Sequence, residues 1–65
     1  MSLEERQILA RGMAVKGNEA ASHNQHQKAV RLFTQAVEYD PSDHRFLGNR
    51  SFCYERLQYH DKWVL

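Results

Sequence analysis

The segment Ala29–Pro41 constrains this chain most, because it predicts a helix that needs neighbours on more than one side. Phe33 follows Ala29 by four residues and precedes Ala36 by three, so all three side chains lie on one helical face. The two alanines let another backbone approach closely, and Phe33 fills the space between them. Further apolar residues widen the stripe beyond what one partner helix covers. Pro41 ends the helix, since the residue before a proline disfavours the α region.

Composition limits the chain to one small all-α unit. A unit of 65 residues hides only about 60% of the surface that its unfolded form exposes, so its stability is marginal. The net charge of +1 with 26% charged residues does not point to a polyanionic partner. A lone cysteine, Cys53, excludes an internal disulfide and fits a reducing compartment, the cytosol or the nucleus. We find no signal peptide and no apolar run of membrane length, and expect no cofactor.

Two further helices are expected around the central one. Ser2 followed by Glu5 is a capping-box pattern that predicts a first helix from there to about Ser22. Its buried face should be formed by Leu9, Met13, Gly17 and Ala20. Gly17 costs about 1 kcal/mol in a helix interior, and a close approach of the second helix would explain that cost. Gly12 carries the same cost and has no comparable explanation.

The polar stretch His23–His26 predicts the first turn, with Asn24 as a cap for a second helix from about Gln25 to Tyr39. Ser42 or Asp43 should cap a third helix. Its apolar positions are Phe46, Leu47, Cys53, Tyr54 and Leu57. The connections are short, so neighbouring helices should run antiparallel.

The chain also shows a weak internal repeat, since an offset of 34 residues aligns Met13 with Leu47 and Gly17 with Ser51. The repeat carries a recognisable signature at Gly17, Ala20, Ala29, Phe33, Ala36 and Pro41. This pattern resembles the tetratricopeptide repeat, an antiparallel helical hairpin that stacks into an α-solenoid. Three positions depart from the family pattern. Met13 stands for its aromatic residue, Lys16 for its leucine and Ala20 for its tyrosine.

The resemblance divides the chain into three parts. Residues 1–9 extend the first helix, residues 10–43 form one complete repeat, and residues 44–65 form part of a second. In that second repeat Trp63 stands where Ala29 stands in the first. The expected turn at Gln58–His60 has no glycine or proline, so we expect the third helix to run on past Leu57 to about Lys62 or Trp63.

The resemblance implies a protein–protein interaction module, of adaptor or co-chaperone type, and no enzyme. Asn18 and Asn49 match positions that hold the acidic C-terminal tails of chaperones in one subset of the family. Arg11, Arg45 and Arg56 are candidates to add positive potential to the same face, which the first and third helices would line. The lysine of that subset falls on Ala14, so a complete clamp is not expected. The alternative is that Asn49 holds the helix stack together and Asn18 is simply solvated.

An incomplete repeat leaves apolar side chains without a cover, and this suggests a homodimer. The candidate contact residues are Phe46, Cys53, Leu57, Trp63 and Leu65. The alternative function is therefore a self-associating repeat fragment with no peptide-binding role of its own.

Other chemistry is weakly represented. His23 and His26 have a spacing that could touch a metal, but no nearby carboxylate or thiol completes a site, so we expect none. No nucleophile–base pair can be identified around Cys53. Nucleic-acid binding is a minor alternative, because basic and aromatic residues interleave on or near the third helix but carboxylates are interspersed among them. The basic and aromatic residues are Arg45, Arg50, Arg56, Lys62, Phe52, Tyr54 and Tyr59, and the carboxylates are Asp43, Glu55 and Asp61.

Overall fold

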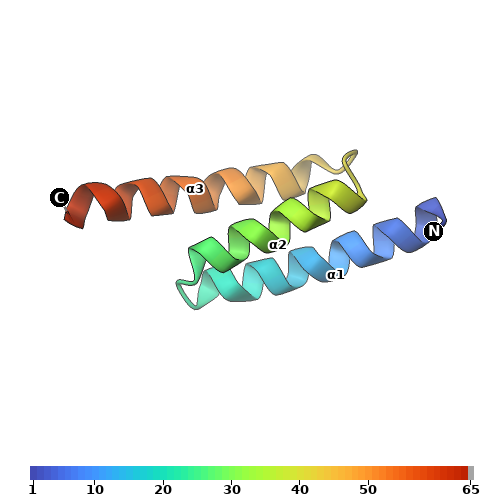
Figure 1. Cartoon of the computed structure of the whole chain (residues 1–65), viewed down its shortest axis with the longest axis horizontal. Helices are drawn as coiled ribbons and strands as arrows, with labels where there is room; N and C mark the ends of the chain where they lie inside the picture. Colours follow the sequence, from blue (N-terminus) through green and yellow to red (C-terminus); the bar gives the residue numbers. More distant parts are fainter. Residues whose placement is uncertain (65) are drawn as a thin grey trace.

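Three helices form the molecule, as the sequence predicts. The computed structural model describes residues 1–64, with side chains as far as Leu57. Helix α1 spans Leu3–Ser22, α2 spans His26–Tyr39 and α3 spans His44–Val64. Successive helices run antiparallel, and α2 lies between α1 and α3, which hardly contact each other (Figure 1). The all-α class and the hairpin-plus-helix arrangement are therefore confirmed.

The start of α1 is fixed by its cap. The hydroxyl of Ser2 accepts a hydrogen bond from the backbone N–H of Glu5 at 3.2 Å. The same hydroxyl donates to the Glu5 carboxylate at 3.3 Å. Glu4 and Glu5 also place negative charge beside the exposed N–H groups of the first turn. The capping pattern seen in the sequence thus begins the helix where it was expected.

The core is built from small residues around one phenyl ring. A methyl group placed on Gly17 would lie 2.9 Å from the ring of Phe33, so α1 and α2 touch backbone to ring at this point. The buried side chains are Ala10, Ala14, Ala20, Ala29, Phe33, Ala36, Phe46 and Cys53. Alanines on both sides of Gly17 keep the two helices close over several turns.

The prediction of which residues form the buried face of α1 was partly wrong. Gly17 and Ala20 are buried, but Leu9 is 37% exposed and Met13 only borders the core. Ala10 and Ala14 occupy the central positions instead. The reason is steric, because at this helix spacing only a methyl side chain fits directly between the two backbones.

The first turn is made by a left-handed residue. Asn24 has a φ of 62°, a conformation that asparagine tolerates better than most residues. The sequence predicted Asn24 as the cap of α2, and this prediction was wrong. Gln25 precedes the helix, and its side chain makes no capping hydrogen bond.

The second turn uses two aspartates. Asp40 is 9% exposed and its Oδ1 accepts from the backbone N–H of Ser42 at 3.3 Å. Asp43 Oδ1 accepts from the backbone N–H of Arg45 at 3.0 Å, which satisfies a first-turn donor of α3. Of the two caps that the sequence allowed for α3, the structure uses Asp43.

A contact between distant residues closes this end of the hairpin. The Arg6 guanidinium donates through Nε to the carbonyl of Tyr39 and through Nη2 to that of Glu38, both at 3.1 Å. These are carbonyls of the last turn of α2, which have no partner within the helix. A cation there also complements the negative end of the helix dipole.

Helix α3 is longer than the helix it packs against. It has 21 residues against the 14 of α2, and it continues as helix through Gln58–His60 to Val64. The expected run past Leu57 is confirmed. Leu57 lies beside the start of α2, so the C-terminal part of α3 projects beyond the α1–α2 hairpin (Figure 1).

Two glycines in α1 provide a matched test of this packing. Gly17→Ala should destabilise the chain by about 1–3 kcal/mol, because the added methyl group overlaps the Phe33 ring. Gly12→Ala meets nothing within 4 Å and should stabilise by up to about 1 kcal/mol through helix propensity. Urea unfolding followed by circular dichroism measures both. Equal effects of the two substitutions would contradict the contact.

Candidate functional site

The two asparagines of the predicted site lie on helices that α2 separates. Asn18 is exposed on α1, next to the buried Gly17. Asn49 is half-buried on α3, next to Arg50. Helices α1 and α3 hardly contact each other, and α2 lies between them (Figure 1). A single ligand that touches both would have to cross α2.

The predicted arginines are exposed, and each lies against a group of its own helix or its cap. Arg45 donates to Asp43 Oδ2 through Nη2 at 2.7 Å and to Oδ1 through Nε at 3.0 Å. The Arg56 guanidinium lies 5.0 Å from the centre of the Phe52 ring. Arg11 approaches the carbonyl of Gln7 at 3.5 Å. These arginines do not converge on one point.

Arg50 was not among the predicted peptide-binding residues, yet its side chain links α3 to α2. Its Nη1 donates to the Thr34 hydroxyl at 3.4 Å, and that hydroxyl donates to the Val30 carbonyl at 2.8 Å. Sequence spacing alone offers no signal for this contact, because the partners lie on different helices.

The self-association surface needs correction. Phe46 and Cys53 were expected to face the missing helix, but they are 3% and 1% exposed within the chain's own core. Both point toward α2, which the sequence could not distinguish from the opposite direction. Leu57 is half-buried. The side chains of Trp63 and Leu65 lie outside the described residues. Burial also raises the pKa of the Cys53 thiol, which keeps it protonated and unreactive.

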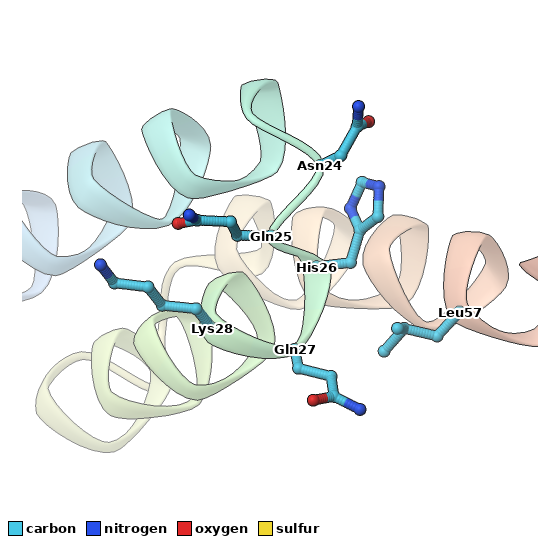
Figure 2. A pocket seen from close by; sticks show the side chains of 6 residues that line it. All are labelled: Asn24, Gln25, His26, Gln27, Lys28 and Leu57. Carbon is cyan, nitrogen blue, oxygen red and sulfur yellow. The ribbon is translucent and has the colours of Figure 1, made fainter.

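Two clefts flank the first turn of α2, and the sequence did not predict them. One, of about 450 Å³, lies between this turn and α3 and is lined by Asn24, Gln25, His26, Gln27, Lys28 and Leu57 (Figure 2). Leu57 reaches into it from α3. His26 Nδ1 is buried there and has no hydrogen-bond partner among the side chains that the structure describes.

The second cleft, of about 420 Å³, lies between the end of α1 and the start of α2. It is lined by Lys16, Glu19, Ala20, His23, Gln25, Lys28 and Leu32. His23 Nδ1 lies 2.9 Å from the carbonyl of Glu19 and must donate to it, because a carbonyl oxygen only accepts. Lys16 of α1 and Lys28 of α2 both line this cleft, and Glu19 is the one carboxylate in its lining.

Metal binding and membrane insertion find no support in the described part of the chain. No group of three or more histidine, cysteine, aspartate or glutamate side chains there could hold a metal ion. No helix there combines the length and apolar character needed to span a bilayer.

The Asp43–Arg45 pair gives a pH prediction. The hydrogen bond from the Arg45 side chain lowers the pKa of Asp43 from 3.8 to about 2. Because the folded-state pKa lies below the unfolded one, the contribution to stability is present above about pH 4 and is lost as the pH falls toward 2. NMR titration of Asp43 should show this pKa, and Arg45→Ala should raise it toward 3.8. Arg56→Ala on the same helix is the control and should leave it unchanged.

Comparison with known proteins identifies the repeat. No family model matches the chain and no solved structure matches it. A 45-residue segment, 69% of the chain, is 40% identical to the E3 ubiquitin-protein ligase TTC3 of Mus musculus. A 46-residue segment, 71% of the chain, is 39% identical to the heat shock protein sti1 homolog of Schizosaccharomyces pombe.

Both relatives contain tetratricopeptide repeats. They are much longer proteins, and the chain spans 2% and 8% of their lengths. The similarity therefore concerns the repeat and not the whole relatives. Together with the signature from Gly17 to Pro41 and the packed hairpin with its third helix, it confirms that the chain belongs to the tetratricopeptide-repeat family.

Proposed function

We propose that the chain is a protein-interaction module that binds an acidic peptide segment across α1 and α3, and that it is not an enzyme. Membership of a family of interaction repeats supports the general role. The ligase activity named for one relative belongs to a protein of which this chain covers 2%, so it does not carry over. We also propose a cytosolic or nuclear location, because a lone cysteine fits a reducing compartment.

The proposal that the chain binds a peptide rests on the arrangement of Asn18 and Asn49. Both amides have solvent access, and their helices lie on either side of α2. A peptide lying across α2 could accept hydrogen bonds from both. Asn49 is half-buried and held next to Arg50, whose side chain is anchored on Thr34, so it offers the more rigid of the two amides.

The lysine of the family's clamp is absent from this chain, and its absence should weaken the binding. Ala14, which stands at the clamp position, is buried and offers no charge. The amide donors carry no positive charge, so the peptide carboxylate would lack the ionic attraction that a lysine supplies. We therefore propose weak binding of a peptide that ends in a free carboxylate, of the kind found at chaperone C-termini.

The two alternatives have less support. A symmetric dimer through the third helices loses Phe46 and Cys53 as contact residues, since both are buried in the protomer. It would depend on Leu57 and on residues outside the described side chains. Nucleic-acid binding finds its best support in the Arg56–Phe52 pair, a single exposed stack.

Binding of a fluorescein-labelled acidic peptide with a free C-terminus, followed by anisotropy, tests the proposal. Asn18→Ala with Asn49→Ala should raise the Kd by about 5- to 100-fold, the loss expected for two solvent-accessible hydrogen bonds. Gln35→Ala, an exposed amide on α2, is the matched control and should change little. A folded chain that binds no such peptide, or one unaffected by the double substitution, would contradict the site.

A further inference from the structure

The described charges are segregated along the molecule's 46 Å axis (Figure 1). The acidic end consists of residues 1–6 and 38–45, where the N-terminus of α1 meets the α2–α3 turn. Its carboxylates, which outnumber its arginines Arg6 and Arg45, are Glu4, Glu5, Glu38, Asp40 and Asp43. The basic end consists of residues 16–31 and 54–57, around the α1–α2 turn. Its cations, which outnumber Glu19 and Glu55, are Lys16, Lys28, Arg31 and Arg56.

The acidic end is negative because its carboxylates outnumber its arginines, and both arginines are engaged within the chain. Arg6 donates to backbone carbonyls of α2, and Arg45 donates to Asp43. Glu4 is exposed there, next to Leu3, which is 69% exposed. The first turn of α1 therefore presents a carboxylate and an apolar side chain next to each other.

The basic end offers a cleft with the complementary properties. The 420 Å³ cleft between α1 and α2 has Lys16 and Lys28 on its two sides, one from each helix. Ala20 and Leu32 give it an apolar part. Glu19 is the one carboxylate of the lining, so the cations are in excess.

We propose that these two ends bind each other between copies of the chain, the Leu3–Glu5 turn of one copy entering the Lys16–Lys28 cleft of the next. The contact joins two different surfaces, so it is heterologous and lets copies add in a row. It goes beyond peptide binding by Asn18 and Asn49, and uses neither residue. The complementary charge and apolar character of the two ends select a second copy as the occupant.

Concentration and salt dependence of molar mass in solution test this. At an ionic strength of about 0.05 M, light scattering should show a mass that rises above 7.7 kDa with concentration and passes that of a dimer. Raising the ionic strength to about 0.5 M should return it toward the monomer, because exposed charge pairs are screened.

Two charge-neutralised variants locate the contact. Glu4→Gln with Glu5→Gln removes the acidic partner and keeps the capping box, which accepts glutamine. Lys16→Gln with Lys28→Gln removes the cations at exposed positions of good helix propensity. Each variant alone should be monomeric. Their equimolar mixture should form a 1:1 dimer and nothing larger, because only one intact pair of ends remains.

Arg11→Gln, which removes an exposed charge outside both ends, is the matched control and should associate like the parent chain. A parent chain that stays monomeric at low salt overturns the proposal, as does association that survives in either variant. A closed dimer unaffected by both variants would point to the third helices instead. Binding of an acidic peptide that depends on Lys16 and Lys28, without self-association, would assign the cleft to another protein. Loss of self-association alone leaves the Asn18–Asn49 peptide assay unaffected.

Discussion

The contact between Gly17 and the ring of Phe33 is the constraint on which the rest of the structure depends. It brings the backbone of α1 against α2, and this spacing decides that alanines, not leucines, occupy the neighbouring core positions. A core of small residues buries little apolar area per residue, so each close contact contributes a large share of a small total. The large side chains of α1, such as Ile8 and Val15, are left on the surface.

A hairpin with so small a core relies on polar contacts at its ends. Ser2 caps α1, Arg6 binds the last carbonyls of α2, and Asp43 caps α3. All of these lie at the same end of the molecule. The start of α2 has no side-chain cap, and it is there that the two clefts and the unpartnered Nδ1 of His26 occur. The two ends therefore differ in structure: polar side chains hold the helices together at one end, and two clefts flank the start of α2 at the other.

The sequence predicted the helices well because their signals are local. The capping box, the Ala-x-x-x-Phe spacing and Pro41 each act within a few residues. The candidate site was harder, because a site depends on what each side chain meets across helices. Arg45 and Arg56 looked like available cations, but Asp43 and Phe52 lie against them. Asn18 and Asn49 match two clamp positions of the family, yet α2 lies between their helices.

The sequence by itself determined the helix order, the hairpin and the continuation of α3 through Gln58–His60, since these follow from periodicity, caps and the absence of helix breakers. Its signature residues also indicated the family by resemblance. Only the tertiary structure decided the directions in which Phe46 and Cys53 point and the pairing of Arg6 with the end of α2. The tertiary structure alone also placed Lys16 and Lys28 in the lining of one cleft. The physical reason is that helical periodicity fixes which residues share a face, whereas the neighbour of that face depends on how helices distant in sequence pack.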